Sequence, residues 1–256
     1  MITTLWGAVR FQLAIARTSP DVLLILVRAP LMTMVLLSIS EYSGRRDLAA
    51  GIVLAPVLMA LWDMTLLIAG EVINRERSWG TLEALVATPA RFFPVVLGRI
   101  GAVTTISMVS FVEAWLVARA GFGISLTVVH GTVFVLCVLA SALAMAGTAT
   151  LMSALFVLAP TARLMQNTLT YPFYLLAGVL VPVSVLPEWL RPLSSVVFLS
   201  WSAELLRQSL STAPVPDAGL SLAVITGLGL AGTLAGLLAV NRALRQARAA
   251  GTLSEV

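Results

Sequence analysis

Long apolar stretches are the feature of this sequence that most restricts its fold. A bilayer core about 30 Å thick requires about 20 apolar residues in a helix that crosses it. Six stretches meet that length: 22–40, 49–73, 94–118, 126–156, 164–183 and 219–240. Only 11% of the residues are charged, against about 25% in a soluble domain. The sequence therefore predicts an all-α integral membrane protein with six transmembrane helices, forming a single domain over residues 1–256.

The cationic residues predict how the chain is oriented. Of the sixteen arginines, ten fall on the side that carries both predicted termini, and the chain has no lysine. The ten are Arg10, Arg17, Arg75, Arg77, Arg91, Arg99, Arg163, Arg242, Arg245 and Arg248. Cytoplasmic segments of membrane proteins are enriched in Arg and Lys. We therefore expect a multi-pass protein of the inner (plasma) membrane, with both termini and the tail 241–256 in the cytoplasm.

The segment before the first span, residues 1–20, has the pattern of an amphipathic helix. Its apolar stripe consists of Leu5, Trp6, Val9, Leu13 and Ala16. A helix with an apolar stripe, a Trp and arginines is typical of the membrane interface. We expect an interfacial helix here, and an ordinary frayed terminus is the alternative.

A polar segment at residues 74–93, between the second and third spans, is longer than a turn requires. Within it, residues 81–87 form about two amphipathic turns, with leucines on one face and Glu83 on the other. Thr88 is suited to cap the next helix and Pro89 to occupy its first position. We expect a short helix on the cytoplasmic surface, which is a suitable docking element for a soluble partner.

The stretch "ERSWGTLEALVATPARFFPVVLGR" resembles the signature of the type-2 family of ABC transporter permeases. The matching residues are Glu76, Gly80, Thr81, Leu82, Glu83, Leu85, Thr88, Pro89, Gly98 and Arg99. It departs from the signature in the extra "SW" before Gly80 and in Arg99, where a lysine is common. The resemblance implies that this segment is the coupling helix, which seats in a cleft of the ATP-binding subunit.

A second region, the external segment 184–218, agrees with the same family. It is too polar and too rich in proline for a seventh span, and we expect it to enter the membrane as short broken helices. Its apolar residues Leu186, Leu190, Leu193 and Val197 are predicted to share one helical stripe. The family pattern is matched at Pro182, Leu186, Pro187, Trp189, Leu190, Glu204 and Arg207.

The family resemblance, together with the absence of a P-loop, implies which partners to expect. A P-loop requires a lysine on the nucleotide phosphates, so this lysine-free chain cannot contain one. We expect a transport subunit that is not itself an enzyme and binds no cofactor, with ATP and Mg on two copies of a separate ATPase subunit. A second permease copy or a sister permease should complete the complex in the bilayer, and no nucleic acid is expected.

Among the charged residues inside predicted spans, Arg28 and Asp63 raise the question of how a charge is held within a membrane. A charge at the centre of a membrane helix costs about 2.5–3.5 kcal/mol on insertion scales, so such residues are expected to be paired or functional. Arg28 and Asp63 are interpreted as an intramembrane pair, with a role of Asp63 in the transport pathway as the alternative. Glu113 and Arg119 are expected to be interfacial charges.

Two other motifs are interpreted structurally. The stretch "GLGLAG" fits a dinucleotide fingerprint, but it lies inside an apolar span with no strand before it. We expect Gly232 and Gly236 to pack closely against another helix instead. The single histidine, His130, has no Cys, Asp or Glu at ligand spacing, so no metal site is predicted.

Together these features predict the membrane subunit of an ABC exporter for a hydrophobic or amphipathic, drug- or antibiotic-like molecule. A polysaccharide or lipid-linked glycan exporter shares the same architecture and is the main alternative. A transporter driven by an ion gradient or a structural scaffold would explain less of the sequence. The substrate, the direction of transport and the choice between homodimer and heterodimer are not encoded in any motif of this chain.

Overall fold

The computed structural model describes residues 6–7, 9–14, 20–44, 49–64, 98, 101–102, 105–158 and 170–250. Within these ranges the chain forms helices joined by turns and loops, and no strand occurs, which confirms the predicted all-α class. The elements are α2 (Pro20–Tyr42), α3 (Ala49–Asp63), α7 (Val109–Phe122), α8 (Gly131–Leu158), η3 (Val183–Val185), α10 (Arg191–Ser195), α11 (Phe198–Leu210) and α12 (Ala218–Ala250).

In the described part of the chain, four helices are long and apolar enough to cross a bilayer. They are Val22–Tyr42, Thr105–Phe122, Gly131–Met152 and Ala218–Ala239, and they correspond to the first, third, fourth and sixth predicted spans. Only residues 49–64 of the second predicted span and 170–183 of the fifth are described. The total of six spans therefore stays a prediction.

The third and fourth predicted spans have the wrong boundaries around residue 123. The helix predicted to end at residue 118 continues to Phe122, and Gly123 ends it with a left-handed φ of 65°. The helix predicted to begin at residue 126 begins at Gly131. The His130 backbone N–H donates to the Ser209 carbonyl, and the His130 side chain lies 2.9 Å from the Ala213 carbonyl. These contacts fix a non-helical connection where apolarity alone predicted helix.

The fifth predicted span differs in the same way, whereas the sixth, 219–240, agrees with the candidate span Ala218–Ala239. Helical residues 170–176 end in a turn at Gly178, which has a φ of 66°, so the predicted boundary at residue 183 is wrong. At the other end of the chain α12 continues ten residues past the predicted boundary at residue 240. Its 33 residues span about 50 Å at 1.5 Å per residue, which exceeds the bilayer core.

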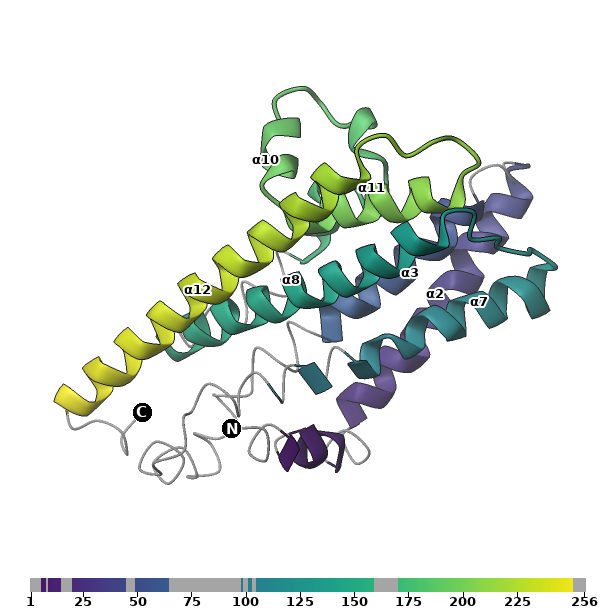
Figure 1. Ribbon diagram of the computed structural model, residues 1–256. Coiled ribbons are helices and arrows are strands. Elements are labelled where there is room, and N and C mark those ends of the chain that lie inside the picture. The colour runs from purple at the N-terminus through teal and green to yellow at the C-terminus, as the bar shows by residue number, and fades with distance from the viewer. Residues whose placement is uncertain are drawn as a thin grey trace.

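The seam between α8 and α12 is the most extensive helix contact, and the two helices run side by side (Figure 1). A Cβ added to Gly229 would lie 2.5 Å from the Ala144 Cα, and one added to Gly236 would lie 2.6 Å from the Leu151 backbone nitrogen. Small residues allow this approach of two backbones in a membrane. The packing role predicted for Gly236 is therefore confirmed, whereas a Cβ at Gly232 would make ordinary contacts.

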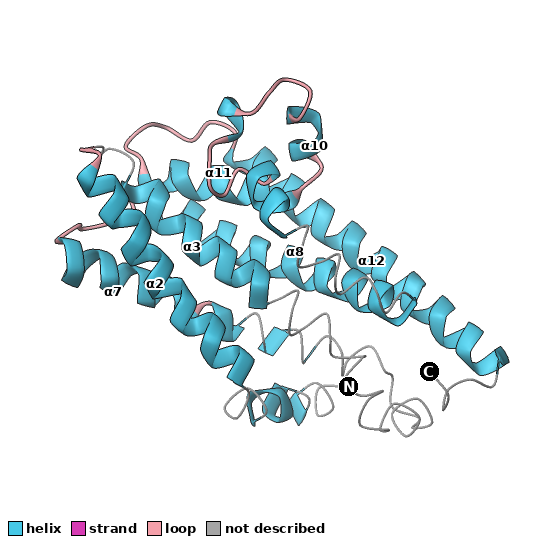
Figure 2. Cartoon of the chain, turned by 180° about the vertical axis from the view of Figure 1, so that it is seen from behind, coloured by secondary structure: helices cyan, strands magenta, loops and turns pink. Residues whose placement is uncertain are grey.

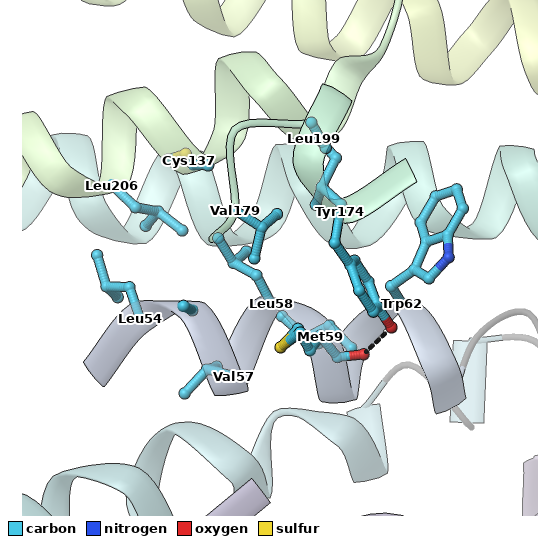
Figure 3. Packing of buried hydrophobic residues seen from close by; sticks show 14 of the residues in the cluster. Leu54, Val57, Leu58, Met59, Trp62, Cys137, Tyr174, Val179, Leu199 and Leu206 are labelled. Carbon is cyan, nitrogen blue, oxygen red and sulfur yellow. Dashed lines mark hydrogen bonds between the residues drawn. The ribbon is translucent and has the colours of Figure 1, made fainter. Parts of the chain in front are cut away.

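The other helices pack around α3 and α11. Helix α2 packs on α3 and α7, which are seen together in Figure 2, and α11 packs on α8, α12 and α3. Buried Leu58, Leu199 and Leu206 belong to one hydrophobic cluster of this core, parts of which are drawn in Figure 3. On the polar side of the α8–α11 contact, Ser141 Oγ donates to Ser202 Oγ at 2.8 Å, beside the fully buried Cys137.

The predicted interfacial helix and the external segment lie toward opposite ends of the bundle. Residues 9–14 are helical, and they lie near the end opposite α10 and α11 (Figure 1). Trp6 and Leu13 are exposed, as an interfacial helix requires, although the location of this helix in a membrane interface stays a prediction. The α12 carboxyl end extends away from α10 and α11 as well.

Candidate functional site

The predicted coupling residues lie outside the described part of the chain. They are Glu76, Gly80, Thr81, Leu82, Glu83, Leu85, Thr88 and Pro89. Their role in contacting an ATPase therefore stays a prediction from the sequence. The described site residues belong to two places in the bundle, one around Asp63 and one around Arg207.

An ion pair joins α2 and α3 inside the bundle. Arg28 Nη1 donates to Asp63 Oδ2 at 2.5 Å, so the structure contains the pair expected from the sequence. The Asp63 side chain is 5% exposed and the Arg28 side chain 37%. A carboxylate this deeply buried requires a cationic partner and further donors, and the pathway role of Asp63 stays a prediction.

Tyr174 supplies the second donor to Asp63, and the sequence did not single it out. Its hydroxyl donates to Asp63 Oδ1 and lies 3.2 Å from the Met59 carbonyl oxygen. Figure 3 shows Tyr174 reaching from the 170–176 helix to α3. The aromatic cluster "YPFY" at residues 171–174, within an apolar stretch, was the available signal, because a buried Tyr hydroxyl requires a partner.

An apolar cavity of about 350 Å³ lies beside this polar contact. Its walls include Trp62, Leu151, Met152, Phe173, Phe198 and Leu228. The rings of Trp62 and Phe173 stack with centroids 3.9 Å apart. Trp62 Nε1 is buried without a hydrogen-bond partner in the described part of the chain. The cavity therefore combines apolar walls with an unused donor on one of its lining side chains.

The external segment does not form the predicted single stripe. Leu186 follows η3, Leu190 precedes α10, Leu193 lies in α10 and Val197 precedes α11, so the four positions belong to no common helix. The reason is the break at Val196 and Val197, after which α11 begins and buries its own apolar face. Pro182, Pro187 and Trp189 are all exposed, and their insertion into the outer leaflet stays a prediction.

Arg207 connects the external segment to the end of the fifth predicted span. Its Nη2 donates to the carbonyls of Gly178 and Val179, the second at 3.0 Å. Glu204 Oε2 lies 3.8 Å from Arg207 Nη1. The two motif residues Glu204 and Arg207 are therefore brought together, and Arg207 holds the turn at Gly178 in place.

The remaining polar residues include Glu113 and Arg119, which were expected to be interfacial charges. No group of three or more His, Cys, Asp or Glu side chains is arranged to hold a metal ion in the ranges described. Arg119 lies 5.7 Å from the centroid of the Trp115 ring, a cation–π contact. Glu113 Oε2 is buried without a hydrogen-bond partner among the described residues, so this carboxyl is less exposed than an interfacial charge was expected to be.

Sequence comparison decides the family. A family model described as ABC-2 type transporter matches residues 3–211 of the 256. The chain belongs to the ABC-2 type transporter family. Among curated proteins, a search finds no match to it.

Membership in the ABC-2 type family agrees with the helical structure and with the type-2 permease resemblance. The chain is a multi-pass membrane protein and the membrane subunit of an ABC transporter. Membrane subunits of the ABC-2 type are transport proteins that work with an ATPase partner and typically lack a nucleotide-binding site of their own. The gradient-driven transporter and the scaffold considered from the sequence are thereby set aside.

Proposed function

We propose that this chain is the membrane subunit of an exporter that moves a hydrophobic or amphipathic small molecule, of a drug or antibiotic type, out of the cell. The observation that carries the proposal is the apolar cavity between α3, α8, α12 and residues 170–176. Ligand sites are commonly concave, mostly apolar and equipped with a few polar groups. Trp62 lines the cavity, and its indole N–H has no hydrogen-bond partner in the described part of the chain.

The energy for export would come from a separate ATPase, with ATP and Mg bound there. Residues 81–87, within the segment 74–93, would form the coupling helix, and closure of two ATPase subunits would push the segment around Gly80 to Thr88. The third span would carry the motion to the transport pathway. A second copy of the chain or a sister permease would complete the pathway, and both termini would lie on the cytoplasmic side of the inner (plasma) membrane.

A polysaccharide or lipid-linked glycan is the alternative substrate. A sugar chain presents many hydroxyl groups, and burying each without a hydrogen bond costs about 1–3 kcal/mol. The walls of the cavity are apolar at Leu151, Met152, Phe198 and Leu228. These walls favour the hydrophobic substrate over the glycan.

The coupling proposal is tested by copurification of the tagged chain from its native membranes in a mild detergent. We expect a stoichiometric P-loop ATPase with the unchanged chain and its loss on Glu83→Arg, because a reversed charge would oppose docking. Glu188→Arg, at an exposed position of the external segment, is the control and should retain the ATPase. Absence of any ATPase, or equal recovery with both variants, would contradict the proposed coupling.

The substrate proposal is tested by filling the cavity. Leu228→Trp places a large side chain in the cavity wall and should reduce ATP-driven transport of a hydrophobic dye in vesicles by about tenfold, or about 1.4 kcal/mol. Leu230→Trp, on the same helix at a position 65% exposed, should transport normally. Equal transport by both variants would exclude this cavity from the pathway.

A further inference from the structure

A second cavity lies where α2 ends, α3 begins and α11 ends. Its volume is about 440 Å³, within the range of roughly 300–1,000 Å³ that is usual for small-molecule sites. Its apolar walls are formed by Leu36, Ile52, Ala55, Val179, Leu180 and Leu210. It shares none of its lining residues with the cavity beside Trp62.

One charged side chain, Arg207, lines this cavity in the described part of the chain. The Arg207 side chain is only 18% exposed. Nη2 is engaged by the carbonyls of Gly178 and Val179. No hydrogen bond uses Nε or Nη1 within the described residues, so part of the guanidinium fork is available to another acceptor.

The positive charge of Arg207 is incompletely balanced by its neighbours. Glu204 Oε2 lies 3.8 Å away, beyond hydrogen-bond distance, and the Glu204 side chain is 52% exposed. Glu204 Oε1 also accepts a hydrogen bond from Gln208 Nε2 at 3.0 Å. Burial lowers the pKa of the Arg207 guanidinium, and Glu204 raises it, yet an arginine side chain stays protonated in proteins. A buried cation beside apolar walls favours an anion.

We propose that this cavity binds an amphiphile with a single anionic head group, whose carboxylate or phosphate contacts Arg207 and whose apolar tail lies along α2 and α3. Arginine binds carboxylate and phosphate oxygens with paired N–H donors. The apolar walls remove the tail from water or from the head-group region. This inference requires only that the chain lies in a membrane, and it does not depend on the proposed coupling to an ATPase.

The test is photolabelling of the purified full chain in a non-ionic detergent. The probe is a long-chain carboxylate with a diazirine in its tail, and labelled peptides are mapped by mass spectrometry. We expect labels on residues 51–55 and 179–182, displaced at least about tenfold more effectively by dodecanoate than by dodecyltrimethylammonium. Absence of labels from residues 51–55 and 179–182, or equal displacement of those labels by the cation, would overturn the proposal, and this comparison of head groups needs no variant.

Two variants add a matched comparison. Gly51 lines the cavity, and a Cβ there would lie 3.6 Å from Arg207 Nε, an ordinary contact. Gly51→Leu should therefore fill the cavity and reduce labelling by about tenfold. Gly227→Leu adds the same bulk to a glycine with no atom within 4 Å of its added Cβ and should leave labelling unchanged. Equal labelling of the two variants would overturn the proposal.

The source of the anion is distinguished in vesicles. Labelling is compared between vesicles of phosphatidylcholine and vesicles that also contain phosphatidylglycerol. Displacement of the probe by phosphatidylglycerol would identify the occupant as a membrane lipid. Displacement only by added dodecanoate would identify a single-chain anion that reaches the cavity from outside the bilayer. Absence of displacement by either anion would overturn the proposal.

Discussion

The α8–α12 seam and the Arg28–Asp63–Tyr174 contact hold helices together in opposite ways. At the seam, glycines let two backbones approach until no Cβ fits at Gly229 or Gly236. Around Asp63, three side chains from α2, α3 and residues 170–176 connect helices through charged and polar atoms. Lipid tails are as apolar as leucine, so close packing and polar contacts are the main sources of helix association in a bilayer.

The two contacts differ in how much movement they permit. Close-packed backbones resist sliding, because any shift brings main-chain atoms into collision. A polar contact can exchange one partner for another, since Arg28 is partly exposed and Tyr174 lies within reach of both Asp63 and Met59. We expect α8 and α12 to move as one body during transport, and the contact around Asp63 to be the place where helices separate.

The largest effect is expected from breaking the seam. Gly229→Leu forces a side chain against the Ala144 backbone, where the added Cβ would lie 2.5 Å from Cα, and should lower the free energy of unfolding by about 3 kcal/mol or more. Gly227→Leu, two residues earlier with open space around it, is the control and should be nearly neutral. Unfolding by SDS in mixed micelles measures both, and equal losses would refute the close-packed seam.

An intermediate effect is expected from the ion pair. Removing one partner of a fully buried pair costs about 3–5 kcal/mol, and because the Arg28 side chain is 37% exposed we expect about 2 kcal/mol for Asp63→Asn. Arg28→Gln combined with Asp63→Asn should cost less than the sum of the two single changes. If the cost of the double change equalled the sum of the two single costs in the same unfolding measurement, the pair would contribute nothing to the free energy of unfolding.

The Arg28–Asp63 pair can also be tested by its effect on transport. Asp63→Asn is predicted to change ATP-driven transport per folded molecule if the polar contact is where helices separate. Vesicles containing equal amounts of folded protein provide the measurement, with Tyr171→Phe as a control because Tyr171 is exposed. Reduced folding with unchanged transport per molecule would exclude Asp63 from the pathway.

The smallest effect is expected between α8 and α11, where a neutral hydrogen bond joins the helices. Ser141→Ala removes the bond to Ser202 at 2.8 Å and should cost about 1 kcal/mol, as interhelical hydrogen bonds in membranes typically do. Ser38→Ala is the control, because the Ser38 hydroxyl is exposed and, among the residues that the structure describes, bonds within its own helix. A loss as large as that of Asp63→Asn would mean that charge adds nothing to the polar contacts of this bundle.

The sequence predicted the helical class, several spans and the Arg28–Asp63 pair from general rules. Apolar length identifies a span, and a charge inside one requires a partner, so both predictions were available without a structure. Boundaries were missed at Gly123, Gly131 and Gly178, because tertiary contacts and left-handed glycines end helices where hydropathy continues. Tyr174 and the Trp62–Phe173 stack were missed because they join segments far apart in the sequence.

Because Cys137 is buried, thiol-labelling reagents should not react with the natural chain, and introduced cysteines can be used to map its topology. The Cys137 thiol is fully buried between α8 and α11, and this residue is the chain's only cysteine. A membrane-impermeant maleimide should therefore leave the natural chain unmodified in intact cells. A single cysteine introduced at position 6, 83 or 189 would then be the one reactive thiol. Its labelling from outside or only after lysis would assign each segment to one face of the membrane.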